Sequence, residues 1–283
     1  MPASRSTKAG QGDRAGQDTA GVGIGGSPTT NHPVVWCAGV PITACGRADA
    51  ARTVVDLARD PAGGIDIHLC NAYTLHLASR DRELMAVLRS ARLNFPDGQS
   101  VVWANRLTHR GLGLPTERVY GPDLFGDVLD LGRPAGLRHF LLGSTPDVLT
   151  GLRARLGRDH PDATVVGGHS PPFRPLDRAE RHAQADMLRD SGAQVVWVGL
   201  GTPKQDREVH RLAGEVPAVF VAVGAAFDFL AATKPQAPAW MRRNGLEWTY
   251  RLAHEPRRLW RRYLFGNVGF VRAAAHWAIR DRR

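Results

Sequence analysis

The stretch Val195-Val-Trp-Val-Gly-Leu-Gly-Thr-Pro-Lys-Gln-Asp206 decides how this chain folds. It begins as a run rich in Val, which is typical of a buried β-strand. Gly199 and Gly201 then break the run, and Thr202 and Pro203 follow. Thr202 is suited to the N-cap of a helix, and Pro203 is suited to the first helical position. The stretch therefore predicts a strand, a tight glycine turn and the start of a helix.

A turn of this kind is also a candidate binding site. It directs free backbone N–H groups and the positive end of a helix dipole at one point, which suits a phosphate group. Lys204 and Gln205 fall in the first turn of the predicted helix, next to anything bound there. An ordinary connection between a strand and a helix would have the same local sequence, so both interpretations stay open at this point.

Short apolar runs alternate with amphipathic segments between residue 33 and about residue 245. Strands that alternate with helices predict an α/β domain, with a Rossmann-like, mostly parallel sheet flanked by helices. The expected strands are 34–40, 65–69, 93–95, 138–142, 164–166, the run that starts at Val195, and 217–223. The expected helices include 47–59, 71–80, 81–90, 100–108, 123–131 and 178–191.

The two ends of the chain differ from this central region. Residues 1–32 are rich in Gly, Ala, Ser and Thr and poor in large apolar side chains, so we expect a disordered arm. Residues 241–283 contain eleven Arg and no Lys against three acidic residues, and they carry +8 of the net charge of +10. We expect a basic helical appendage over 246–283. Its charge indicates a polyanionic partner: nucleic acid, an anionic membrane or a phosphorylated substrate.

Cys37, Cys45 and Cys70 are the three cysteines of the chain. Their odd number argues against a disulfide framework, and their spacing is not that of metal ligands. This usage favours a reducing, cytosolic location. The sequence also contains no paired cluster of His, Asp or Glu with metal spacing, so no metal site is predicted.

Several of the predicted strands end in glycine-containing loops. Ligands of open α/β sheets bind outside the carboxyl ends of the strands, so these loops should face one crevice and form a nucleotide site. The loops are Pro96-Asp97-Gly98, Gly143-Ser144, the segment from Gly199 through Gly201 to Gln205, and Gly224-Ala225-Ala226. The P-loop pattern and the third glycine of the dinucleotide fingerprint are missing, which disfavours a P-loop NTPase and an NAD or FAD protein. No cofactor is predicted.

Three polar residues at these strand ends are candidate site residues. Asp97 lies between Pro96 and Gly98, where it would act as a general base or simply as a turn residue. Asn71 follows the strand 65–69, and it would either bind a ligand or cap the next helix. Asp228 follows Gly224 and is equally consistent with a site residue and a capping acid.

The basic tail contains arginines at intervals that suit a polyanion. Arg258 and Arg261 are three residues apart and share a helix face, and Arg251 lies two turns earlier. Guanidinium groups bind phosphate bidentately and remain charged at physiological pH. The interspersed aromatic residues suit a lipid headgroup region or stacking on nucleic-acid bases, and a solvated basic helix is the simplest alternative. These aromatic residues are Trp248, Trp260, Tyr263, Phe265 and Trp277.

Taken in order, these motifs resemble the WecG/TagA/CpsF glycosyltransferases, glycosyltransferase family 26. The resemblance covers about residues 34–270. The blocks that carry it are Asn71, Phe95-Pro-Asp-Gly98, Glu117-Arg-Val-Tyr-Gly-Pro-Asp-Leu124, Phe140-Leu-Leu-Gly-Ser144, Val198-Gly-Leu-Gly-Thr-Pro-Lys-Gln205, Val223-Gly-Ala-Ala-Phe-Asp228, Gly245-Leu-Glu-Trp-Thr-Tyr-Arg251, Glu255-Pro-Arg-Arg-Leu259 and Arg261.

The resemblance implies an inverting, metal-independent transfer of a sugar, usually N-acetylmannosamine, from a UDP donor to a polyprenyl-diphosphate-linked N-acetylglucosamine. It implies that Asp97 is the catalytic base and that Asn71 and Gln205 are site residues. It also implies that Arg251, Arg258 and Arg261 belong to an appendage that covers the active site and contacts the cytoplasmic face of the membrane. The expected partners are therefore the two substrates and an anionic membrane surface, with no nucleic acid, and the family often forms homo-oligomers.

One position departs from the family pattern. Leu69 stands two residues before Asn71, where the family often has a threonine. Because a polar contact near the sugar is missing there, the identity of the donor sugar stays open. The rival interpretations are a nucleic-acid-binding protein that uses the basic aromatic tail and a dinucleotide oxidoreductase, which the missing third glycine disfavours.

Overall fold

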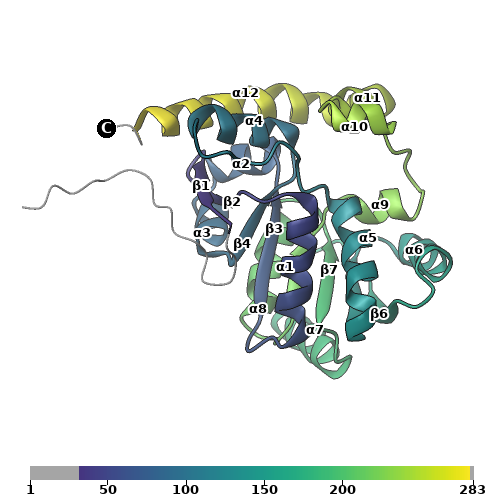
Figure 1. Ribbon diagram of the computed structural model, residues 1–283. Coiled ribbons are helices and arrows are strands. Elements are labelled where there is room, and N and C mark those ends of the chain that lie inside the picture. Colours follow the sequence, from purple (N-terminus) through teal and green to yellow (C-terminus); the bar gives the residue numbers. More distant parts are fainter. Residues whose placement is uncertain (1–31, 281–283) are drawn as a thin grey trace, which may run out of the picture.

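The fold is built on a fully parallel sheet, whose strands spread across the middle of Figure 1 behind α1 and α5. The computed structural model describes residues 32–280. In this part of the chain, six strands pair in the order β4-β3-β8-β7-β5-β6. Their bounds are β3 Ile65–Cys70, β4 Leu93–Pro96, β5 Arg138–Gly143, β6 Thr164–His169, β7 Val195–Gly199 and β8 Val219–Ala222. The predicted mostly parallel α/β sheet is confirmed.

The two faces of the sheet are covered by different helices, because successive residues of a strand point to opposite faces. In β7, Val195 and Trp197 pack on one side with α1 and α5, whereas Val196 and Val198 pack on the other with α7 and α8. The helices of this domain are α1 Arg47–Arg59, α2 Ala72–Ala78, α3 Arg82–Ser90, α4 Gln99–Thr108, α5 Gly121–Gly132, α6 Pro146–Asp159, α7 Arg178–Asp190, α8 Lys204–Ala213 and α9 Ala226–Leu230, with a short 3₁₀ turn at Arg133–Ala135.

The prediction of a single strand over 34–40 is wrong. The segment forms part of an antiparallel hairpin, in which β1 Val34–Cys37 pairs with β2 Val40–Thr43. Ala38 and Gly39 make the turn with φ values of 50° and 85°. The continuous apolar run hid this reversal, because both strands are largely buried and no polar residue marks the turn. The predicted disordered arm, residues 1–32, lies outside the described residues apart from His32.

The C-terminal segment consists of α10 Ala239–Arg243, α11 Glu247–His254 and α12 Pro256–Arg280. Figure 1 shows α12 lying across the domain above α2, on the side where the strands lead into α2 and α4. The contact with α2 depends on two small residues of α12. A Cβ on Gly266 would approach the Tyr73 ring to 3.0 Å, and one on Gly269 would approach Nδ1 of His76 to 1.9 Å. Close packing of these two helices therefore requires glycine at position 269.

We expect Gly269→Ala to loosen α12 from α2, because its Cβ would overlap the His76 ring. Overpacking of this kind costs about 1–3 kcal/mol, although alanine is the better helix former by about 1 kcal/mol. Hydrogen exchange of the α12 amides should become faster. The control is Gly157→Ala in α6, where a Cβ meets nothing within 4 Å. In that variant, exchange of the α6 amides should stay unchanged or become slower. Slower exchange of the α12 amides in Gly269→Ala would contradict the close packing of Gly269 against His76.

Candidate active site

The candidate site lies where the parallel strands end. In the register of β3 and β4, Cys70 stands opposite Pro96, so Asn71 and Asp97 follow neighbouring strands at the same level. Nδ2 of Asn71 donates a hydrogen bond to one carboxylate oxygen of Asp97 at 3.4 Å, and the backbone N–H of Gly121 donates to the other at 3.4 Å. The two residues predicted from separate motifs are therefore partners in one site.

Asn71 fulfils its predicted capping role, and its contact with a ligand stays a prediction. Its side-chain oxygen accepts hydrogen bonds from the backbone N–H groups of Tyr73 and Thr74, at 3.0 and 3.1 Å, so it is the N-cap of α2. Its amide nitrogen is thereby directed at Asp97. Gly98, the N-cap of α4, lies directly beside Asn71, and a Cβ there would make an ordinary contact with the Asn71 side chain at 3.4 Å.

The surroundings of Asp97 bring its pKa closer to neutral pH. Burial raises the pKa of Asp97 to about 6. The nearby Arg118 cation and the hydrogen bonds from Asn71 and Gly121 oppose this rise, and the carboxylate of Glu247 adds to it. The residue nevertheless remains partly exposed. A carboxylate with these properties can accept a proton from a bound hydroxyl group.

The loop between β7 and α8 is organised by Gln205 rather than by Thr202. The helix α8 begins at Lys204, Pro203 is its N-cap, and the Thr202 side chain makes no capping hydrogen bond there. The predicted N-cap was therefore wrong by one residue. Instead, the Gln205 carboxamide accepts a hydrogen bond from Gly201 N–H at 3.0 Å and donates one to Oγ of Thr202 at 3.4 Å. Lys204 is exposed beside this loop.

The other glycines of the strand ends have visible packing roles. A Cβ on Gly143 would come within 2.6 Å of the Gly199 carbonyl oxygen, and one on Gly199 within 2.8 Å of the Phe227 ring. Ser144 N–H donates to the same Gly199 carbonyl at 3.0 Å. Gly224, with a φ of 57°, lies against the Gln205 side chain. Close approach of these strand ends explains the glycines, and their contact with a ligand stays a prediction.

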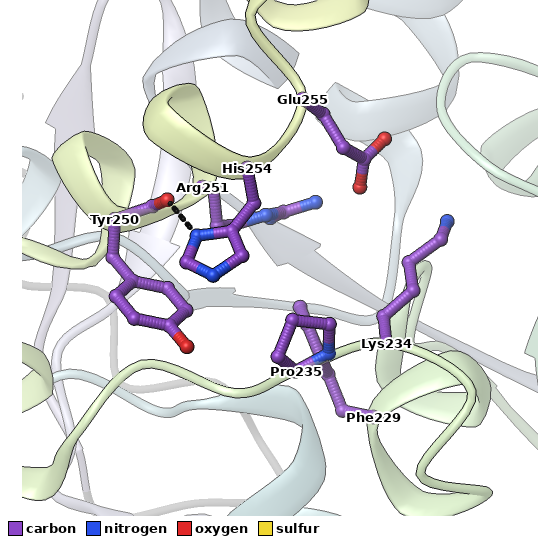
Figure 2. Close-up of a pocket in the computed structure, with 7 residues that line it drawn as sticks. All are labelled: Phe229, Lys234, Pro235, Tyr250, Arg251, His254 and Glu255. Carbon is purple, nitrogen blue, oxygen red and sulfur yellow. Dashed lines mark hydrogen bonds between the residues drawn. The ribbon is translucent and has the colours of Figure 1, made fainter.

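A cavity of about 230 Å³ lies between α9, the segment that follows it and α11. Figure 2 shows Arg251 and His254 of α11, with Glu255 just after it, facing Lys234 and Pro235. The Arg251 guanidinium lies 5.2 Å from the centre of the Phe229 ring. Nζ of Lys234 is held by the Asp228 carboxylate at 2.9 Å. Asp228 therefore positions the Lys234 cation beside this cavity. This role differs from the two predicted from sequence, a site residue and a capping acid.

The predicted arginines of the appendage do not all gather in one place. Arg258 forms an ion pair with Glu255, which lines the cavity beside Arg251. Arg261 is exposed, and its guanidinium lies 5.2 Å from the ring centre of its neighbour Trp260. Arg261 is not part of the cavity lining, so its role at the site stays a prediction.

Two further cations near the site were missed by the sequence analysis. Arg262 points inward, with its guanidinium 4.4 Å from the centre of the Tyr73 ring. Burial lowers its pKa, and the positive charges of Arg251 and Arg258 lower it further, which places these three arginines close together. Arg118 is the cation next to Asp97. Arg118 lies within a family motif and Arg262 directly follows one, but their positions next to Asp97 and Tyr73 are seen only in the structure.

A buried ion pair joins the Gln205 loop to the strand that leads to Asn71. Nδ1 of His68 on β3 lies 3.1 Å from Oδ1 of Asp206 on α8, and both side chains are fully buried. Asp66 lies 3.6 Å from the other ring nitrogen of His68. Burial alone would lower the pKa of His68, but the hydrogen bonds and negative charges of Asp206 and Asp66 outweigh it and raise the pKa to about 9. His68 is therefore protonated at neutral pH.

We expect His68→Gln to lower the free energy of unfolding at pH 6.5 by about 3–5 kcal/mol, because it leaves Asp206 as an uncompensated buried charge. The folded-state pKa of His68 is raised, so its contribution is complete below about pH 6.5 and is lost as pH rises through about 9. Urea unfolding at several pH values measures both effects. The control is His182→Gln on α7, which changes an exposed histidine. An equal loss of stability at pH 6.5 and pH 10 would contradict the conclusion that His68 stabilises the fold in its protonated form.

The fold and site describe an α/β protein with a carboxylate of raised pKa at the carboxyl edge of its sheet. Residues 35–283 match the glycosyl transferase WecG/TagA/CpsF family, and the chain belongs to that family. It is 32% identical over 202 residues to the N-acetylglucosaminyldiphosphoundecaprenol N-acetyl-beta-D-mannosaminyltransferase of Bacillus subtilis (strain 168), covering 71% of this chain and 75% of that protein. The protein is therefore a glycosyltransferase, as the motif resemblance predicts.

Proposed function

We propose that this enzyme transfers an N-acetylhexosamine, with N-acetylmannosamine the first candidate, from a UDP donor to a polyprenyl-diphosphate-linked N-acetylglucosamine. The product would serve cell-surface polysaccharide synthesis. Family membership and the activity named for the Bacillus subtilis relative support this substrate pair. The observation that carries the proposal is the position of Asp97, hydrogen-bonded to Asn71 and with its pKa raised to about 6 by burial.

In the proposed reaction, Asp97 removes the proton of the acceptor hydroxyl group. The hydroxyl oxygen attacks the anomeric carbon on the face opposite UDP, a new glycosidic bond forms, and the bond to the diphosphate oxygen breaks. The configuration is inverted, and UDP leaves with the bonding electron pair. Arg251 and Lys234 of the cavity, with Arg258 beside them, would stabilise the growing charge of the diphosphate. We propose that these cations take the place of a metal ion.

We expect Asp97→Asn to lower kcat by about 10²–10⁴, because the amide cannot accept the proton. Binding of UDP should be retained, since Asp97 is assigned to the acceptor. The measurements are turnover with a lipid-diphosphate-linked N-acetylglucosamine, read by mass, and thermal shift with UDP. In the unsubstituted enzyme, kcat/KM should fall as pH drops below about 6, where Asp97 becomes protonated. Near-normal turnover of Asp97→Asn would refute the base assignment.

We further propose that α12 rests on an anionic membrane surface on the cytoplasmic side. The face of α12 opposite α2 carries an exposed apolar stripe, which a helix in contact with water does not favour. The members of this stripe are Trp260, Leu264, Val268, Val271 and Ile279. Exposed arginines, among them Arg257, Arg261 and Arg272, lie beside it. Among residues 32–280, no helix is long and apolar enough to span a bilayer.

We expect the double substitution Leu264→Ser and Val268→Ser to weaken binding to phosphatidylglycerol vesicles by roughly tenfold or more, since two apolar side chains lose their burial in lipid. Vesicle co-sedimentation measures the effect. The control is Leu131→Ser, which changes an exposed leucine at the other end of the domain, on α5. Equal vesicle binding by the double variant and the control would show that this face of α12 is not the membrane contact.

A further inference from the structure

Glu247 is an acidic residue of the basic appendage, and it is buried against the domain. Its side chain is at the start of α11, and the residue is 8% exposed. One carboxylate oxygen accepts a hydrogen bond from Nη2 of Arg118 at 2.6 Å, and the other accepts one from the Tyr120 hydroxyl at 3.2 Å. The Arg118 guanidinium also lies 4.3 Å from the centre of the Tyr120 ring. A single carboxylate thus holds two side chains of the segment before α5.

The segment that Glu247 holds is the same one that positions Asp97. Val119, between the two side chains bound by Glu247, donates its backbone N–H to the carbonyl of Pro96 at 2.8 Å. Gly121, the next residue after Tyr120, donates its N–H to the Asp97 carboxylate. Backbone contacts to Pro96 and Asp97 therefore alternate with side-chain contacts to Glu247 along four consecutive residues. These residues are a direct connection between α11 and Asp97.

The same contacts set the electrostatic surroundings of the base. Arg118 favours the charged form of Asp97, and Glu247 disfavours it. Because Glu247 pairs with Arg118, the docked appendage offsets the effect of that cation on Asp97. Asn71 and the Gly121 N–H complete the polar groups that face the carboxylate. Cys70 and Tyr120 are the other titratable groups next to it, and burial is the main reason that their pKa values are raised.

We propose that Glu247 is a positioning residue: through Arg118 it couples docking of α11 to the strength of Asp97 as a base. The proposal rests on the proposed function, since it requires Asp97 to accept the proton. It gives the appendage a role in the chemical step in addition to its arginines. With α11 docked, Asp97 is a base matched to neutral pH. With α11 displaced, Arg118 loses its partner, and its full charge weakens the base.

The test uses Glu247→Gln and Arg118→Gln in the full-length enzyme. Glutamine retains the shape of Glu247 and one oxygen that can accept from Arg118 but removes the charge, so the acid limb of kcat/KM should move to lower pH by about one pH unit. Arg118→Gln removes the cation, so the limb should move in the opposite direction. The Asp97 carboxyl resonance, identified by comparison with Asp97→Asn in ¹³C NMR, should follow the same two shifts without any turnover.

The control is Arg243→Gln, which removes an exposed cation of α10 in the same C-terminal segment. It should leave the midpoint unchanged. If Glu247 were only structural, Glu247→Gln and Arg118→Gln would lose rate at the midpoint of the control, and that result would overturn the proposal. An NMR midpoint of Asp97 that is unchanged in Glu247→Gln would overturn it as well. If the NMR midpoints shift but Asp97→Asn remains active, the coupling stands and the proposed function fails.

Discussion

The parallel pairing of β3 with β4 is the constraint on which the site depends. Their register sets Cys70 opposite Pro96, so the next residues of both strands, Asn71 and Asp97, must lie side by side. Asn71 then caps α2 with its oxygen, and this leaves its nitrogen no direction but toward Asp97. One residue therefore starts a helix and orients the Asp97 carboxylate, the base of the proposed reaction.

The sequence was informative wherever one segment determines its own structure. The parallel sheet and the placement of Asn71 and Asp97 at one edge follow from apolar runs and turn residues, and they are confirmed. It was uninformative where two distant segments act on each other. Glu247 and Arg118 are 129 residues apart, and neither has a local pattern that predicts their pairing. The misplaced N-cap at Thr202 has the same origin, because the Gln205 side chain organises that loop instead.

Two buried ion pairs connect separate parts of the chain to the site, and they differ in kind. His68 and Asp206 are both fully buried within the domain, where they fix α8 against β3. Arg118 and Glu247 join the domain to the appendage and are slightly more exposed, at 13% and 10% of their side-chain surface. Buried pairs add little stability over apolar packing, but removal of one partner is costly. Such pairs therefore specify an arrangement more than they strengthen it.

The helix α12 has to satisfy two surfaces at once. Its glycines at 266 and 269 bring it close to α2, which carries Tyr73 at the start of the helix capped by Asn71. Arg262 is thereby brought over Tyr73, on the site side of the helix. The opposite face is apolar and exposed. Because the two faces belong to one rigid helix, a surface that binds the outer face also fixes the position of the inner arginines. With α12 on a membrane, as proposed, the arginines of its inner face would lie at a set distance from the lipid that anchors the acceptor, at the carboxyl edge of the sheet where Asp97 also lies.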